Sequence, residues 1–145
     1  MADVILSAEH VAKTFRVGFW GRPVEALRDV SFELRAGESL GYLGPNGSGK
    51  TTSIKCILSL IRPTSGTLRL FGADPAEPMA RARVGYLPES PYFYDWLTPR
   101  EVLDYVGHLY GLEGVVRRQR AKELLDKLGL GHATDRPLRG FSKGM

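Results

Sequence analysis

The sequence contains a single cysteine, Cys56, among its 145 residues. One thiol excludes an internal disulfide framework and a cysteine-rich zinc site. The sequence also lacks an apolar run close to the ~20 residues that a membrane-spanning helix needs. Asp3 and Glu9 interrupt the short apolar stretch at the start, where a secretion signal would lie. We therefore expect a soluble, cytoplasmic protein in which Cys56, set in an apolar stretch, is a buried and unreactive thiol.

A strong charge of one sign is also lacking. The chain carries 20 Lys and Arg against 16 Asp and Glu, which gives a formal net charge of +4. A nucleic-acid-binding domain usually concentrates more positive charge, so we expect no nucleic-acid partner. A phosphate ligand would account for the excess equally well. Because 43% of the residues are hydrophobic and the 17 Gly and 9 Pro follow no period, the composition is that of one ordinary globular domain.

The first half of the chain is predicted to be mostly strand. Residues 4–15 and residues 30–34 indicate two strands of a small antiparallel sheet, the second by its period of two. The short apolar run at residues 39–43 is typical of a buried parallel strand. Residues 67–71 and 83–87 are predicted as two further strands.

The second half is predicted to be helical, and one helix is expected earlier, directly after residue 50. Three sets of apolar residues at helical spacing predict three buried helix faces. They are Ile54, Ile57, Leu58 and Ile61; Val102, Leu103, Val106 and Leu109; and Ala121, Leu124, Leu125 and Leu128. Thr98, Pro99 and Glu101 predict the start of the second helix through a capping box, and Gly129 predicts the end of the third.

Residues 44–51, here called the P-loop, read GPNGSGKT and fit G-x-x-x-x-G-K-[ST] at every fixed position. Glycines allow backbone N–H groups to wrap phosphate oxygens, and the following helix adds its partial positive charge. In this pattern Lys50 can reach the β- and γ-phosphates, and the Thr51 hydroxyl can ligate Mg²⁺. The expected ATP-binding residues of this segment are Gly44, Pro45, Asn46, Gly47, Ser48, Gly49, Lys50, Thr51 and Thr52.

The motifs of the chain resemble those of the ATP-binding cassette (ABC) ATPases. Residues 44–52 look like the Walker A motif, residues 84–89 resemble the strand and Q-loop, and residues 141–145 (FSKGM) are similar to the signature Leu-Ser-Gly-Gly-Gln. Residues 26–32 and 63–66 are also phrases common in that family. The resemblance covers essentially the whole chain in the correct order.

The resemblance implies roles for residues outside the P-loop. In the family an aromatic residue of the first strand region stacks on adenine, and Phe15 stands at that place. Phe19 or Trp20 could serve instead, and Phe15 could be a core residue. Glu89 stands where the family usually has the Q-loop glutamine and is the second expected Mg²⁺ ligand, although a surface glutamate is the alternative.

The resemblance also implies that residues 141–145 bind the ATP held by a partner subunit. Ser142 and Gly144 match the family's signature, whereas Phe141, Lys143 and Met145 depart from it. Lys143 would add a positive charge beside the γ-phosphate. We expect Ser142, Lys143 and Gly144 to face the partner's ATP.

The family's Walker B aspartate, catalytic glutamate and switch histidine follow the signature, and none can be placed within these residues. His10, His108 and His132 all precede the signature. Phosphoryl transfer needs a group that orients the attacking water. We therefore expect residues 1–145 alone to be marginally stable and to hydrolyse ATP negligibly, whereas the parent protein is an ATPase.

The predicted fold is α/β: a P-loop ABC ATPase core with an N-terminal antiparallel β subdomain in residues 1–90 and part of the α-helical subdomain in residues 91–145. The resemblance implies the ATP-binding subunit of an ABC transporter. It would bind ATP and Mg²⁺, pair with a second ATPase subunit as a homo- or heterodimer, and lie on the inner face of the membrane against a separate permease. A soluble translation-factor-type ABC ATPase and a non-hydrolysing nucleotide-binding remnant are the alternatives.

Two side-chain groups in the second half have competing interpretations. Tyr92, Phe93, Tyr94 and Trp96 follow the Q-loop position and could contact a membrane partner or pack between subdomains. Arg117, Arg118, Arg120 and Lys122 could bind an anionic surface, but a solvated helix face is the favoured interpretation.

Overall fold

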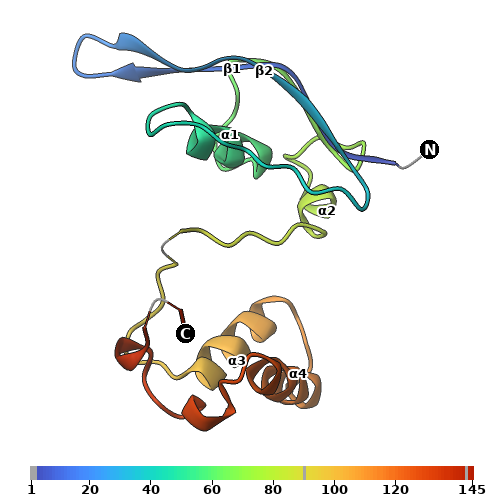
Figure 1. The fold of residues 1–145 in the computed structure, drawn as a ribbon, viewed down its shortest axis with the longest axis vertical. Coiled ribbons are helices and arrows are strands. Elements are labelled where there is room, and N and C mark those ends of the chain that lie inside the picture. The colour runs from blue at the N-terminus through green and yellow to red at the C-terminus, as the bar shows by residue number, and fades with distance from the viewer. Residues whose placement is uncertain (1–2, 90, 143) are drawn as a thin grey trace. The chain divides into compact units, whose positions relative to one another are not determined.

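The computed structural model describes residues 3–89, 91–142 and 144–145. The chain divides into two compact units, Met1–Tyr86 and Leu87–Met145. The first unit contains the sheet and the P-loop, and the second contains two longer helices (Figure 1). The sequence predicts a boundary between residues 90 and 91, between the β subdomain with the P-loop core and the helical subdomain. That division stays a prediction.

The first unit is built on a three-stranded antiparallel sheet with the order β2-β1-β3. Its strands are β1 (Val4–Val17), β2 (Arg22–Arg35) and β3 (Ser65–Leu70). The predicted antiparallel pair is confirmed, but β2 begins well before the predicted residue 30. Pro23 is tolerated in it because β2 is an edge strand, whose outer side needs no ladder hydrogen bonds.

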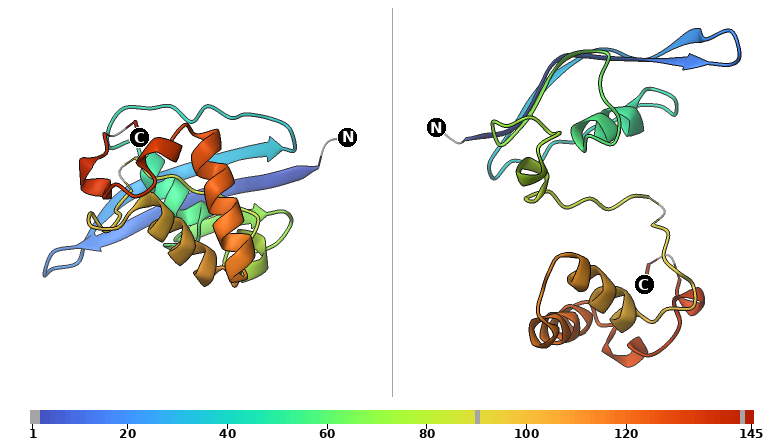
Figure 2. Two further views of the ribbon diagram at one scale, coloured as in Figure 1. Left: turned by 90° about the horizontal axis from the view of Figure 1, so that it is seen from below. Right: turned by 180° about the vertical axis from the view of Figure 1, so that it is seen from behind.

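Helix α1 (Lys50–Ile57) packs against this sheet and completes its core (Figures 1 and 2). The core consists of Ala8, Val11, Leu27, Cys56 and Leu68. Cys56 is only 2% exposed, which confirms the predicted buried thiol. Burial raises its pKa above the ordinary value, and the nearby Lys13 charge offsets part of this shift. The thiol is therefore a poor nucleophile.

The predicted apolar face of α1 is wrong in part. The helix ends at Ile57, and its buried residues are Ser53 and Cys56, whereas Ile54 is 37% exposed. Beyond Ile57 the chain turns, and the N–H groups of Leu60 and Ile61 both donate to the Lys55 carbonyl. Ile57 and Ile61 pack at the margin of the core. The sheet beneath α1 therefore selects a different stripe of the helix from the one that apolar spacing indicates.

Two predicted strands, residues 39–43 and 83–87, have no strand structure. Leu43 is 92% exposed and Leu87 is 83% exposed. A strand forms only where a neighbour takes up its backbone hydrogen bonds, and no segment in the described ranges pairs with either run. The short helix α2 (Pro78–Arg81) was not predicted.

The second unit pairs α3 (Pro99–Leu109) with α4 (Gly114–Lys127). Two short 3-10 turns, Gly131–Ala133 and Leu138–Gly140, follow α4. The chain then returns toward the start of α3, because the Leu138 and Arg139 N–H groups donate to the carbonyls of Leu97 and Asp95. None of the helices in the described ranges has the length and apolar character to cross a membrane.

The predicted buried faces of α3 and α4 are also wrong in part. Val106 and Leu109 of α3 are 40% and 66% exposed, and Leu124 and Leu128 are 47% and 70% exposed. The buried residues are small or close to the helix contact: Pro99, Gly107, Ala121 and Leu125. Apolar spacing identifies a face but does not say how much of it a partner covers.

Arg117 holds the two helices together and is not part of a solvated face. Its side chain is 17% exposed and pairs with Asp104 at 2.8 Å, and its Nη1 donates to the Leu112 carbonyl at 2.8 Å. This pairing lowers the pKa of Asp104, first through the hydrogen bond from Arg117. Gly107 lies against the aliphatic part of the Arg117 side chain, since a Cβ at this glycine would be 2.9 Å from Arg117 Cδ. Lys122 does lie exposed, paired with Asp126.

The start of α3 allows a direct test. Thr98 caps the helix through the Glu101 N–H at 3.3 Å, and Glu101 Oε2 accepts from the Thr98 N–H at 2.8 Å, which confirms the predicted capping box. Thr98→Ala is expected to destabilise the chain by about 0.5–2 kcal/mol, measured as a shift in the urea unfolding midpoint. Thr134→Ala is the matched control, because its hydroxyl donates only to a short 3-10 turn.

The same cap makes stability depend on pH. The Thr98 N–H and hydroxyl lower the pKa of Glu101 below 4.5, so this contribution is fully present above 4.5 and is lost as the pH falls through the folded pKa. Thr98→Ala removes the hydroxyl but keeps the N–H, which is the larger cause of the lowered pKa, so it should reduce this part of the acid sensitivity without abolishing it. Identical slopes of the unfolding midpoint against pH in both proteins would contradict the assignment.

Candidate functional site

The P-loop leads directly into α1, whose first residue is Lys50. Gly49 is the N-cap residue, with φ of +90°, a left-handed conformation that glycine adopts without strain. A Cβ at this position would lie 2.4 Å from the Ala26 carbonyl oxygen and 2.6 Å from Leu27 Cδ2. The glycine therefore allows the loop to sit directly on β2, and this contact fixes where the helix begins.

The Lys50 ammonium lies back over the P-loop. Its Nζ donates to the carbonyl of Gly44 at 2.5 Å and to that of Pro45 at 2.8 Å. The Ser48 N–H closes the loop by donating to the Pro45 carbonyl at 3.2 Å. The partial positive charge at the start of α1 and the Lys50 ammonium therefore both lie at the P-loop. No acidic residue in the first turn of α1 offsets these positive charges. That combination suits an anion such as a phosphate.

Tyr42 and Ser53 stabilise the end of the P-loop at Gly49, and neither residue was predicted from the sequence. Ser53, 4% exposed, donates from Oγ to the Gly49 carbonyl at 3.3 Å. Because a hydroxyl has one proton, the Tyr42 hydroxyl, 2.9 Å away, is then the donor to Ser53 Oγ. Phe32 of β2 packs against the Tyr42 ring at 5.8 Å. The available signal in the sequence was Ser53, a polar residue on the side of α1 that is buried, where a hydroxyl needs a hydrogen-bond partner.

Thr51 and Thr52 occupy the first turn of α1, the former exposed and the latter half-buried. Glu89, the other expected Mg²⁺ ligand, is exposed and belongs to the second unit. Within residues 3–89, 91–142 and 144–145, no three His, Cys, Asp or Glu side chains gather to hold a metal. The Thr51 hydroxyl is an oxygen ligand of the kind that suits Mg²⁺ when water and substrate phosphates supply most of the other ligands.

Phe15 lies on β1, paired across the hairpin with Val24 of β2. The Lys13 ammonium lies 5.1 Å from the centre of its ring and donates to the Arg62 carbonyl, just beyond α1, at 2.6 Å. Phe15 therefore lies on the face of the hairpin that carries α1. Ala26, on which Gly49 rests, is only two residues beyond Val24. Along β2, the strand partner of Phe15 is therefore two residues from the position that Gly49 contacts.

Phe19 and Trp20, the alternative stacking residues, lie at the turn of the hairpin. They are 97% and 84% exposed, and their rings pack edge to face at 5.6 Å. They lie beyond the last strand pair, Val17 and Arg22, and so further along the hairpin from Ala26 than Phe15 does. This geometry favours Phe15 for the stacking role.

The signature residues lie at the end of the second unit. Ser142 and Gly144 are exposed, directly after the 3-10 turn Leu138–Gly140, and the Met145 N–H donates to the Ser142 carbonyl at 3.0 Å. Lys143 lies outside the described residues. Exposure of Ser142 and Gly144 is compatible with contact to a ligand on another subunit, and their role stays a prediction.

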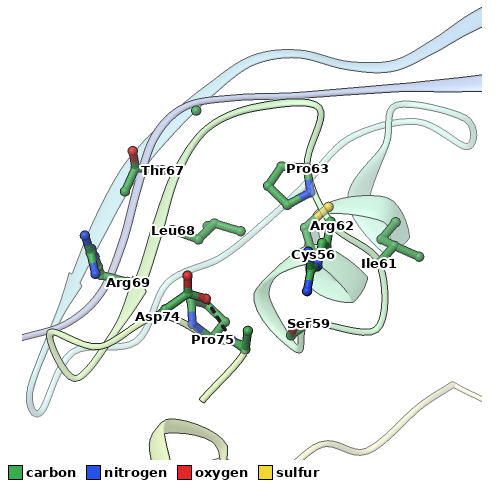
Figure 3. A pocket seen from close by; sticks show the side chains of 12 residues that line it. Cys56, Ser59, Ile61, Arg62, Pro63, Thr67, Leu68, Arg69, Asp74 and Pro75 are labelled. Carbon is green, nitrogen blue, oxygen red and sulfur yellow. Dashed lines mark hydrogen bonds between the residues drawn. The ribbon is translucent and has the colours of Figure 1, made fainter.

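A cavity of about 450 Å³ lies elsewhere in the first unit, between the end of α1 and β3 (Figure 3). Cys56, Leu68 and Asp74 are among its lining residues, and none of the described P-loop residues lines it. Its thiol has a raised pKa. The cavity is therefore separate from the candidate nucleotide site.

Comparison with known proteins decides the family. The profile of the ABC transporter family matches residues 27–145, which include the P-loop, Glu89 and the signature residues. The chain belongs to the ABC transporter family. Its resemblance to the ABC ATPases, drawn from the motifs, is confirmed.

Curated ABC transporter proteins match nearly the whole chain. An uncharacterised ABC transporter ATP-binding protein of Synechocystis is 42% identical over 99% of this chain and 41% of its own length. The daunorubicin/doxorubicin resistance ATP-binding protein DrrA of Streptomyces peucetius is 40% identical over 83% of this chain and 37% of its own length. The chain thus spans about two fifths of the length of these ABC relatives.

Solved structures confirm the predicted fold as part of a P-loop ABC ATPase. The structure of an ATP-binding subunit of an ABC transporter superposes with a TM-score of 0.77 at 31% identity, over 97% of this chain and 57% of the other. A dimeric ATP-binding cassette in a post-hydrolysis state with ADP and Pi has the same fold, with a TM-score of 0.80 at 23% identity, over 95% and 63% of the two chains.

Proposed function

We propose that the parent protein is the ATP-binding subunit of an ABC transporter and that it couples ATP binding and hydrolysis to transport through a separate permease. The observation that carries this proposal is the P-loop, seated on β2 through Gly49 with Lys50 folded over it and no carboxylate in the first turn of α1. Relatives named as resistance ATP-binding proteins support the transport role. A soluble ABC ATPase remains the alternative.

In this proposal residues 44–52 bind the ATP phosphates, Phe15 stacks on adenine, and Thr51 and Glu89 hold Mg²⁺. Mg²⁺ supplies charge neutralisation between the β- and γ-phosphates when bound. The residues of this chain orient the triphosphate: backbone N–H groups of the P-loop and the Lys50 ammonium bind its oxygens, and the Tyr42–Ser53 pair holds the loop in place.

Family membership supports a proposal for the partners and the location. We propose a second ATPase subunit, whose ATP is contacted by Ser142, Lys143 and Gly144, and a membrane permease at the inner face of the membrane. The dimeric cassette of the same fold supports the pairing. Residues 1–90 would form the β subdomain and P-loop core of the complete domain, and residues 91–145 the helical subdomain up to the signature.

We further propose that residues 1–145 alone bind ATP without turning it over. The water-orienting groups that the family has after its signature are not among the residues of this chain, and phosphoryl transfer without them is slow. Two exposed apolar runs, at residues 39–43 and 86–87, support a low stability for the chain by itself.

Phe15→Ala is expected to weaken ATP binding to the chain by about 5- to 150-fold, which corresponds to the ~1–3 kcal/mol of stacking on one base. Phe15→Trp should keep the affinity, because a larger ring still stacks. The measurement is a titration with a fluorescent ATP analogue, repeated with inorganic triphosphate as competitor. The triphosphate lacks a base, so its affinity should be the same in Phe15→Ala and the unaltered chain.

Phe19→Ala is the matched control, because this ring is exposed at the hairpin turn. A loss of ATP affinity in Phe19→Ala but not in Phe15→Ala would show that the hairpin turn provides the stacking residue. Equal loss of ATP and triphosphate binding in Phe15→Ala, with a lower unfolding midpoint, would instead make Phe15 a core residue.

A further inference from the structure

The turn of the β1–β2 hairpin presents an apolar patch that nothing in the nucleotide site uses. Phe19 and Trp20 are 97% and 84% exposed, and their rings pack on each other edge to face. On the adjoining strand ends, Val17 and Val24 are 54% and 49% exposed. These four residues are here called the tip patch. The hairpin carries the patch beyond α1 within the first unit (Figures 1 and 2).

One backbone hydrogen bond closes this turn. The last paired residues of the hairpin are Val17 and Arg22, and the Gly21 N–H donates to the Gly18 carbonyl at 3.1 Å across the turn. A turn closed in this way can enter a less polar environment without leaving that donor and acceptor unpaired. The two aromatic rings are therefore displayed on a defined and compact support.

The charges around the tip patch are all of one sign. Arg16 and Arg22 flank it on the two strands and are exposed, and neither has an ion-pair partner among the described residues. Residues 16–24 contain no Asp or Glu, and the first acid beyond them, Glu25, pairs with Arg28. The tip thus combines an exposed Phe–Trp pair with two available guanidinium groups.

We propose that the hairpin tip binds the surface of a membrane that contains anionic lipids. Trp and Phe prefer the water–lipid interface, where an apolar ring meets hydrated headgroups. Arginine adjacent to that layer is attracted to anionic headgroups and keeps its charge in water. The proposal does not depend on nucleotide, so it stands or falls separately from the proposed function.

The size of the patch favours lipid over a protein partner. A stable protein–protein interface takes about 20–30 residues on each side, whereas the tip offers only residues 16–24. Shallow insertion of an aromatic pair with electrostatic attraction needs no larger surface. In a transporter subunit this contact would hold the first unit against the bilayer beside the permease.

Tryptophan fluorescence provides the test, since the chain has two tryptophans, Trp20 and Trp96. In Trp96→Phe the emission reports on Trp20 alone. Vesicles of phosphatidylglycerol and phosphatidylcholine in equal parts are expected to shift this emission to the blue, and brominated lipids to quench it. Phosphatidylcholine vesicles should give a much smaller shift, and added salt should reverse the binding. Trp20→Phe, which leaves Trp96, should give no shift.

Flotation of the chain with the same anionic vesicles provides a second measurement. The double variant Arg16→Gln, Arg22→Gln should lower partitioning about 30-fold, since each cation near the surface contributes about fivefold. Phe19→Ser with Trp20→Ser should abolish flotation. Tyr92→Ser, at another fully exposed aromatic residue, is the matched control and should float unchanged. An unchanged circular dichroism spectrum establishes that the variants fold.

Three results would overturn the proposal. One is a Trp20 emission that neither type of vesicle changes. Another is an equal loss of flotation in Tyr92→Ser and in the tip variants, because the chain would then bind vesicles through exposed aromatic residues in general. The third is a concentration-dependent blue shift of Trp20 without lipid, which would assign the tip to contact with a second copy of the chain.

Discussion

Replacing Lys50 with Ala is expected to weaken ATP binding to the chain by about 10- to 100-fold, the loss of one charged hydrogen-bonding group. The ammonium now lies on the carbonyls of Gly44 and Pro45, at the positive end of α1. A bound triphosphate would draw it from these carbonyls onto phosphate oxygens, which are stronger acceptors. The affinity for a fluorescent ATP analogue measures the loss directly.

In the parent protein Lys50→Ala should lower ATP turnover by about 10²–10³-fold, because the charge also stabilises the transition state. Residues 1–145 alone should show no turnover above background, with or without the substitution. Steady turnover by residues 1–145 that Lys50→Ala abolishes would refute the proposal that these residues alone bind ATP without turning it over.

Lys55→Ala is the matched control for this experiment. Lys55 lies in the last turn of the same helix, is exposed, and is distant from the P-loop along α1. Lys55→Ala removes the same charge from the chain as Lys50→Ala does, so a general electrostatic effect would lower ATP affinity equally in both variants. Such equality would contradict a specific role for Lys50.

The features that the sequence predicted correctly are local ones. The capping box at Thr98 and Glu101 and the P-loop before α1 each depend on residues within a few positions of one another. The antiparallel pair of β1 and β2 follows from alternation and a glycine-bounded turn. In these cases the short-range pattern already contains the interaction that stabilises the structure.

The features that it predicted wrongly depend on distant partners. Residues 39–43 are as apolar as a buried strand, but nothing in the described ranges pairs with them. The buried stripe of α1 is set by the sheet, which selects Ser53 and Cys56 over Ile54. Arg117 was interpreted as a solvated residue because a charge pattern on one helix cannot reveal Asp104 on another.

The candidate site divides in the same way. The P-loop residues can be proposed from the sequence because the pattern that suits phosphate lies in one short segment. The Tyr42–Ser53 support is not, since it joins two positions whose contact exists only after α1 packs on the sheet. Phe15 is intermediate: its place in the sequence suggests stacking, but only the hairpin register places its partner Val24 two residues from Ala26, which Gly49 contacts.

Gly49→Ala is expected to destabilise the chain by roughly 2–4 kcal/mol, the sum of a left-handed alanine and a steric overlap. The overlap is with the Ala26 carbonyl oxygen, 2.4 Å from the new Cβ, on a strand that cannot move without disrupting the core at Leu27. The loop must then lift from β2, and ATP affinity should fall with stability. Urea unfolding and nucleotide titration measure the two effects.

Two neighbouring glycines separate the contributions. Gly47 also has a positive φ, +83°, but a Cβ there meets nothing within 4 Å, so Gly47→Ala should cost only the strain, about 1–2 kcal/mol. Gly41 has neither feature, and Gly41→Ala should stay within about 0.5 kcal/mol of the unaltered chain. Equal destabilisation by Gly47→Ala and Gly49→Ala would mean that the contact with β2 contributes nothing. The P-loop would then be held by its own backbone, by Lys50 and by the Tyr42–Ser53 pair, without support from β2.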